Sequence, residues 1–196
     1  MKPHRHSIRL HGYDYTSAGW YFVTICCKDR EHLFGKIVGA YRIRPHIRND
    51  ISPREPQVIL SQLGEVVRDE WLKTAKMRPE IELGEFVIMP NHFHAIIGIT
   101  GTTVVPRNPM QTGVCDTPMQ TGVCDTPLRS PSKTIGAIIR GFKSAVTSHA
   151  RRNGMAVNIW QRNYYEHIIR NEESYSKISD YIRNNPAQWQ EDECFR

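Results

Sequence analysis

The chain has 196 residues, of which 39% are hydrophobic and 23% are charged, and its formal net charge is +6 at pH 7. This composition is typical of a single soluble globular domain, and no apolar run is long enough to cross a bilayer. The basic N-terminus lacks the apolar segment of a secretory signal, which predicts a cytoplasmic protein with no membrane partner. The excess of Lys and Arg favours a polyanionic partner, most simply nucleic acid, although a solvated basic surface would have the same composition.

Strand and helix patterns alternate along the chain. Runs rich in β-branched and aromatic residues predict strands, and apolar residues spaced three and four apart predict amphipathic helices. The predicted elements are a strand at Gly19–Lys28, a helix at roughly Val58–Met77, strands at Ile81–Met89 and His92–Ile99, a helix at Ser132–Arg152, a strand at Ile159–Arg170 and a last helix from Asn171 to Asn185.

This order predicts an α+β fold. The first six elements form a ferredoxin-like βαββαβ unit, in which two helices cover one face of an antiparallel sheet. The added C-terminal helix can then cover the other face. A basic, proline-containing connection lies between the first strand and the first helix.

A perfect tandem repeat of MQTGVCDTP occupies Met110–Pro127. Its Pro, Gly, Thr and Asp content predicts a flexible surface insertion, at about residues 101–131, within a single domain that spans residues 1–196. The repeat contains Cys115 and Cys124, but no CxxC pair or nearby histidine completes a tetrahedral zinc set.

Two histidines interrupt the apolar strand VIMPNHFHAIIGI. Side chains alternate between the faces of a strand, so His92 and His94 share one face while Phe93 and Ala95 share the other. The pair is either a set of hydrogen-bonded core residues or two ligands of one metal ion.

The last helix supplies a second pair of polar residues. Tyr181 and Asn185 are four residues apart and therefore lie on one side of the helix. If that side meets the open sheet face, the Asn185 amide oxygen can join the two imidazoles around a metal, with Tyr181 beside it. Tyr181 is otherwise an ordinary residue of an amphipathic helix.

Three motifs, MPNHFHAII, WQRNYYEHIIRNEESY and DYIRNNPAQW, together resemble the REP-associated tyrosine transposases, relatives of the single-tyrosine HUH transposases of small bacterial insertion sequences. The resemblance extends from GWYFVTICC to NNPAQW and leaves the tandem repeat outside. It implies a nucleoid-associated, metal-dependent transposase and endonuclease that cleaves and rejoins single-stranded DNA at hairpin-forming, REP-like sites, as a monomer or a homodimer.

The resemblance also implies roles for individual residues. His92 and His94 match the histidine-hydrophobic-histidine signature and Asn185 completes the metal site, whose ion is Mg²⁺ or Mn²⁺. Tyr181 matches the nucleophile that forms a 5′-phosphotyrosine. Tyr164 and Tyr165 are rival nucleophiles, but as neighbours on a strand neither has a helical partner like Asn185.

Basic and aromatic residues are candidates for DNA binding because cations neutralise phosphates and aromatic rings stack on bases. The candidate cations are Arg5, Arg9, Arg42, Arg44, Arg48, Arg140, Lys143 and Arg151. The candidate stacking surfaces are Trp20, Tyr164 and Trp189.

Two readings from other classes stay open. A non-catalytic nucleic-acid-binding module with an RRM-like sheet would explain the charge and the fold, but the strands lack an aromatic RNP pattern. A metallohydrolase built on the two histidines would need a further ligand, and HFHAIIGITG offers no following Asp or His.

Overall fold

A computed structural model describes residues 17–39, 56–100, 134–155, 158–192 and 194. Its strands are β1 (Gly19–Cys26), β2 (Gly35–Val38), β3 (Gln57–Leu60), β4 (Ile81–Ile88), β5 (His92–Ile99) and β6 (Tyr165–Ile169). Its α-helices are α1 (Gln62–Met77), α2 (Ile135–Arg152) and α3 (Glu172–Asn184), and single 3₁₀ turns lie at Lys28–Arg30 and Trp189–Glu191. The predicted insertion and its repeat lie outside the described residues.

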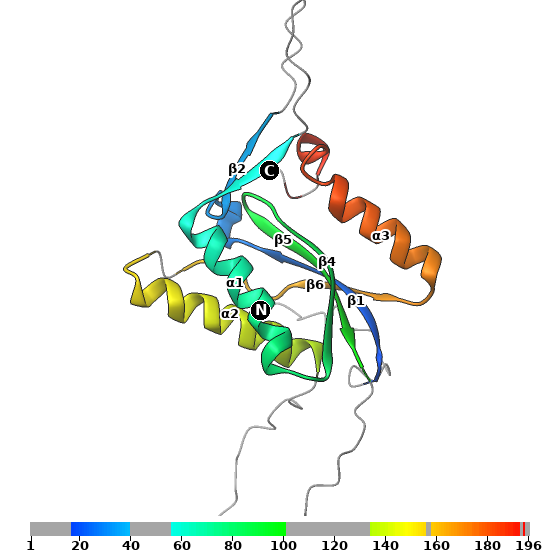
Figure 1. Cartoon of the computed structure of the whole chain (residues 1–196). Coiled ribbons are helices and arrows are strands. Elements are labelled where there is room, and N and C mark those ends of the chain that lie inside the picture. The colour runs from blue at the N-terminus through cyan, green and yellow to red at the C-terminus, as the bar shows by residue number, and fades with distance from the viewer. Residues whose placement is uncertain (1–16, 40–55, 101–133, 156–157, 193, 195–196) are drawn as a thin grey trace, which may run out of the picture.

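Four strands form an antiparallel sheet in the order β4-β5-β1-β6. Helices α1 and α2 cover one face of this sheet and α3 crosses the other, as Figure 1 shows. This is the predicted ferredoxin-like arrangement with an added C-terminal helix, and the α+β prediction is confirmed.

Strand β5 is central, and all eight of its residues are buried. On the α1 and α2 side, Phe93 meets Trp71 and Phe142 at ring-centroid distances of 4.9 and 5.6 Å. On the α3 side, Ile96 packs with Ile182 in a second, smaller cluster. Two apolar layers therefore enclose β5, and its histidines must be satisfied inside the fold.

The predicted start of the first helix is wrong. Val58–Leu60 belong to β3, which pairs with β2 in a separate two-stranded sheet. Helix α1 begins only after Ser61, whose hydroxyl accepts a hydrogen bond from the Gly64 N–H at 3.1 Å and thereby caps the helix. Ile59 in β3 lies four residues before Leu63 in α1, so the helical spacing of apolar residues extended across this boundary and misplaced the start of the helix.

Two predicted strands are shorter than expected. Strand β1 ends at Cys26, where a 3₁₀ turn follows. Strand β6 begins at Tyr165, and only an isolated bridge between Cys27 and Trp160 precedes it. The chain between Trp160 and Tyr165 bends at Asn163, which has a positive φ of 70°. The ammonium of Lys143 donates to the carbonyls of residues 161 and 163 and holds this bend.

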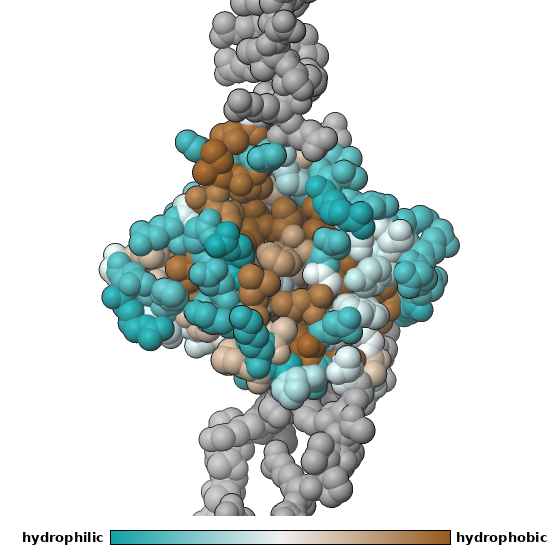
Figure 2. All heavy atoms as spheres, in the orientation of Figure 1, coloured by the Kyte–Doolittle hydropathy of each residue, from teal (hydrophilic) through white to brown (hydrophobic). Residues whose placement is uncertain are grey.

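Apolar side chains gather over the β2–β3 hairpin and continue between α1 and α3, as Figure 2 shows. Ile59 on β3 is 51% exposed and belongs to the large exposed hydrophobic residues. In the described part of the chain, no helix combines the length and apolar character that a bilayer span requires.

Candidate metal and nucleophile site

Strand β5 presents two imidazoles to α3. His92 and His94 lie on the same face of the strand, with ring centroids 4.4 Å apart, and both are buried. The Thr24 hydroxyl on β1 lies 2.8 Å from His94 Nδ1, and the Asn91 amide lies 2.8 Å from His92 Nδ1. Each ring is thus held at Nδ1, and both Nε2 atoms face the space beneath α3.

Helix α3 brings Tyr181 and Asn185 to the same place. The helix begins after Asn171, whose side chain accepts from the Ser174 N–H, and two acidic residues occupy its first turn. Tyr181 Oη lies 3.2 Å from His94 Nε2, and Asn185, the C-cap of the helix, is fully buried. The structure therefore brings together all four residues selected from the sequence.

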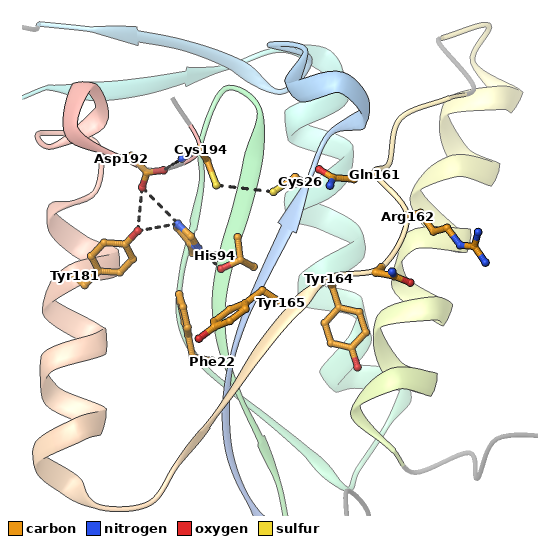
Figure 3. Close-up of a pocket in the computed structure, with 12 residues that line it drawn as sticks. Phe22, Cys26, His94, Gln161, Arg162, Tyr164, Tyr165, Tyr181, Asp192 and Cys194 are labelled. Atoms are coloured by element: carbon orange, nitrogen blue, oxygen red, sulfur yellow. Dashed lines mark hydrogen bonds and ion pairs between the residues drawn. The ribbon is translucent and has the colours of Figure 1, made fainter. Parts of the chain in front are cut away.

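Asp192 is a fifth member that the sequence analysis missed. Its Oδ2 accepts hydrogen bonds from the Tyr181 hydroxyl at 2.9 Å and from Asn185 Nδ2 at 2.8 Å. The same oxygen lies 3.7 Å from His94 Nε2 and 4.0 Å from His92 Nε2. The carboxylate thus lies beside the phenol and both imidazoles, and Figure 3 shows its contacts with Tyr181 and His94.

The hydrogen bonds of Asn91 fix the tautomer of His92. The Cys194 carbonyl can only accept, so the end of the Asn91 amide that lies 2.7 Å from it is the NH₂ group. The other end, the amide oxygen, faces His92 Nδ1 and requires a proton there. Burial and the neighbouring His94 lower the pKa of His92 to about 3, so the ring is neutral and Nε2 carries a lone pair.

Two buried acceptors at this site have no hydrogen-bond partner among the described residues. They are His92 Nε2 and Asn185 Oδ1, the oxygen of an amide whose NH₂ group is already bound to Asp192. Unpaired buried acceptors are costly, and a cation is what would satisfy them. Ligand atoms of His92, His94 and Asp192 all lie within 4.8 Å of one another, and these residues can hold a metal ion.

The Asp192 carboxylate shifts the acidity of its neighbour. Burial and the Asp192 charge raise the pKa of Tyr181 well above its ordinary value. Burial alone would raise the pKa of Asp192, but His94, the Asn185 amide and the Cys194 N–H outweigh it and hold that pKa well below its usual range. The proton between the two groups therefore resides on the phenol.

A cavity of about 740 Å³ opens beside these residues. Tyr181, His94 and Asp192 form one wall, and the segment before β6 forms another (Figure 3). Tyr165 is 54% exposed and lies near Phe22, while the Arg162 side chain extends from the rim away from Tyr181. Neither Arg162 nor Phe22 was expected at the site, although Phe22 belongs to a predicted strand and Arg162 to one of the three motifs.

Three of the predicted DNA-binding cations lie in the described part of the chain. Arg140 and Arg151 are exposed on α2, on the sheet face opposite α3. Lys143 binds backbone carbonyls, as described above. The five remaining arginines lie outside the described residues, namely Arg5, Arg9, Arg42, Arg44 and Arg48. The assignment of these residues to DNA binding stays a prediction.

The predicted stacking surfaces have partners within the fold. Trp189 stacks on His92 with a centroid distance of 5.7 Å, and Trp20 meets Tyr175 edge to face at 5.1 Å. The Tyr164 hydroxyl donates to Glu166 at 2.7 Å.

We expect Asn91→Ala to weaken metal binding by about 10- to 100-fold, the usual cost of removing a residue that orients a ligand. The variant loses the acceptor that keeps the proton on His92 Nδ1. Isothermal titration with Mn²⁺ measures the change, and circular dichroism checks folding. Asn91→Asp keeps that acceptor but loses the donor to the Cys194 carbonyl, so comparison of the two variants separates the contact with His92 from the contact with Cys194. Equal affinities of Asn91→Ala and wild type would contradict the assignment.

Comparison with known proteins finds a close relative and several distantly similar solved structures. The chain is 43% identical to an uncharacterized protein of Haemophilus influenzae over 192 residues, which cover 98% of this chain and 93% of the relative. The chain belongs to the same protein family as this relative. No protein-family model matches the sequence.

Two solved structures are also similar to this chain. One is a REP-associated tyrosine transposase bound to a REP hairpin, with 20% identity, a TM-score of 0.48, and coverage of 96% of this chain and 74% of that chain. The other is named as a putative transposase from Deinococcus radiodurans, with 15% identity, a TM-score of 0.40, and coverage of 94% and 97%.

Proposed function

We propose that this protein is a metal-dependent transposase and endonuclease that cleaves and rejoins single-stranded DNA through a 5′-phosphotyrosine on Tyr181. The observation that carries the proposal is the position of the Tyr181 hydroxyl, 3.2 Å from His94 and beside the unpaired acceptors of His92 and Asn185. A phenol next to a buried cation site is the arrangement that nucleophilic attack on a phosphodiester needs.

The donor set fits a divalent cation. His92, His94 and Asp192 would hold it, and the free oxygen of Asn185 is a further candidate ligand. Imidazole nitrogens with hard oxygens suit Mn²⁺ somewhat better than Mg²⁺. When bound, the ion would supply positive charge that stabilises the charge developing on the scissile phosphate.

Residues of the chain account for the remaining chemistry. Tyr181 Oη forms a bond to phosphorus while the bond to the 3′ oxygen breaks, which leaves a 5′-phosphotyrosine and a 3′-hydroxyl. Asp192 Oδ2 accepts the phenolic hydrogen bond and thereby orients the attacking oxygen, and the proton that the phenol loses balances the one that the departing 3′ oxygen gains. Because the protein–DNA bond retains the phosphodiester linkage, a second 3′-hydroxyl can attack it and join strands without ATP.

Single-stranded DNA is the proposed partner. The cavity beside Tyr181 contains the aromatic side chains of Phe22 and Tyr165 with a cation, Arg162, at its rim. Aromatic platforms and cations together bind single strands, because bases stack and phosphates are neutralised. The proposed preference for hairpin-forming DNA comes from the resemblance of the three sequence motifs. The site itself is compatible with a monomer and with a homodimer.

A metallohydrolase is the second candidate, and Asp192 is the observation that favours it. Two histidines and a carboxylate form a common set of metal ligands, and Asp192 supplies the third ligand that the sequence near the histidines lacked. In that case water would attack and no protein–DNA bond would form.

The test uses a single-stranded hairpin from the palindromic repeats flanking the protein's own gene, labelled at either end. With Mn²⁺ or Mg²⁺, the 3′-labelled strand should form an adduct that survives denaturing electrophoresis, and the 5′-labelled strand should give a shorter free fragment. Cleavage without an adduct would favour the hydrolase. Tight binding without cleavage would favour the binding module.

Arg162→Ala should weaken binding of single-stranded DNA and lower the slope of log K against log salt by about 0.7, the value for one phosphate contact. Fluorescence anisotropy over a salt series measures this slope. Lys76→Ala is the matched control, because Lys76 is exposed on α1 across the sheet. Equal slopes for both variants would show that Arg162 contacts no phosphate.

A further inference from the structure

Two thiols from distant parts of the chain meet at the wall of the cavity. Cys26 ends β1, Cys194 follows Asp192, and their sulfur atoms lie 3.9 Å apart although 168 positions separate them in sequence. Both residues are free, partly buried and line the cavity next to Tyr181 (Figure 3). Neither has a role in the chemistry described above.

Separate contacts hold each thiol in place. The Cys26 backbone pairs with His92 of β5, and its carbonyl accepts from the Gln161 N–H at 2.9 Å. The Cys194 N–H donates to Asp192 Oδ1, and its carbonyl accepts from Asn91 Nδ2. The two sulfurs are therefore brought together by the same hydrogen bonds that build the candidate metal site.

We propose that Cys26 and Cys194 are an oxidative modification site, at which a disulfide fixes the segment carrying Asp192 over the cavity. A small-molecule disulfide such as glutathione disulfide is the oxidant. The Cys26 sulfur attacks it and releases one glutathione. The Cys194 sulfur then attacks the Cys26 sulfur and releases the second, so that two protein thiols are oxidised and one disulfide is reduced.

The local chemistry selects Cys26 over its neighbour. Cys26 lines the cavity, and its sulfur lies 3.9 Å from that of Cys194. Cys27 points into the core and is fully buried. A thiol that lines a cavity is accessible to a small-molecule disulfide, whereas a buried thiol is not.

The consequence for catalysis rests on the proposed function. Asp192 binds the Tyr181 hydroxyl and lies two residues before Cys194. A covalent bond at Cys194 would hold this segment over the cavity and restrict the space in which a scissile phosphate must fit. We therefore expect the oxidised protein to form the DNA adduct more slowly than the reduced protein.

The test detects the cross-link without DNA, metal or activity, so its failure is distinct from failure of the proposed function. Full-length protein carrying Cys115→Ser and Cys124→Ser is equilibrated in glutathione buffers, alkylated, and digested without reduction. Mass spectrometry should find a peptide joining residue 26 to residue 194, at a yield about tenfold or more above that in urea, because closing so long a loop is unfavourable in the unfolded chain.

Single cysteine variants identify which two sulfurs form the cross-link. The cross-link should persist in Cys27→Ser and disappear in Cys26→Ser and Cys194→Ser. The proposal would be overturned if Cys194 were still a free thiol, and hence alkylated, in every oxidising buffer. It would also be overturned if a glutathione adduct formed on Cys26 and Cys194 never displaced the glutathione. If the cross-link forms but oxidised and dithiothreitol-reduced proteins give equal adduct yields, the inferred effect on cleavage is overturned.

Discussion

Tyr181→Phe should lower formation of the covalent DNA adduct by about 10⁴-fold or more, the scale on which enzymes respond to loss of a nucleophile. The substitution removes one oxygen and leaves the ring, which contacts His94 and Phe22 at centroid distances of 5.3 and 6.1 Å. Folding and DNA affinity should therefore change little. Denaturing electrophoresis of the 3′-labelled hairpin measures the adduct, and anisotropy measures the affinity.

Tyr165→Phe is the matched control for this experiment. Tyr165 lines the same cavity and is more exposed than Tyr181, which is 39% exposed, so access alone would favour Tyr165 as the nucleophile. We expect Tyr165→Phe to keep adduct formation. The reverse pattern, with the adduct lost in Tyr165→Phe and kept in Tyr181→Phe, would assign the nucleophile to β6 and contradict the proposed function.

His92→Leu should abolish stabilisation by Mn²⁺. At a free metal concentration of 100 times Kd, binding to the wild type contributes about 2.7 kcal/mol to the free energy of unfolding. That gain corresponds to a rise in Tm of roughly 5–11 °C for a chain of this size. The variant loses the proposed ligand nitrogen, for which the described residues supply no hydrogen-bond partner, so its Tm should not respond to the metal.

The metal-free proteins provide a second readout for this variant. His92→Leu removes an unsatisfied buried acceptor but also leaves the Asn91 oxygen without its donor, so the two effects oppose each other and the metal-free Tm should move little. His167→Leu controls for general histidine binding, because His167 is exposed on β6. A Tm rise with Mn²⁺ in His92→Leu equal to that of the wild type would exclude His92 as a ligand.

Local patterns predicted most of what positions the site. Alternation along a strand placed His92 and His94 on one face, and the spacing of four residues placed Tyr181 and Asn185 on one side of a helix. The docking of α3 on the open sheet face followed from the number and order of the elements. These features depend on short sequence separations, which periodicity captures.

The missed features depend on contacts that no short pattern encodes. Asp192 lies eleven residues after Tyr181, beyond the end of α3 and a 3₁₀ turn, so no helical spacing relates the two. The Cys26 and Cys194 pair likewise arises from tertiary contacts alone. The pairing of β2 with β3 was also missed. A signal for the end of β3 was present, because Ser61 is a good helix N-cap and marks where α1 begins.

The residues of the site belong to parts of the fold that should differ in their local stability. His92 and His94 belong to a central strand that is buried along its whole length, where amide hydrogen exchange should require global unfolding. Asp192 belongs to a segment after α3 that is held by a few side-chain hydrogen bonds and can open in a local fluctuation. Such an opening would withdraw the carboxylate while both imidazoles keep their places, so the proposed ligand set would change its composition without the sheet unfolding.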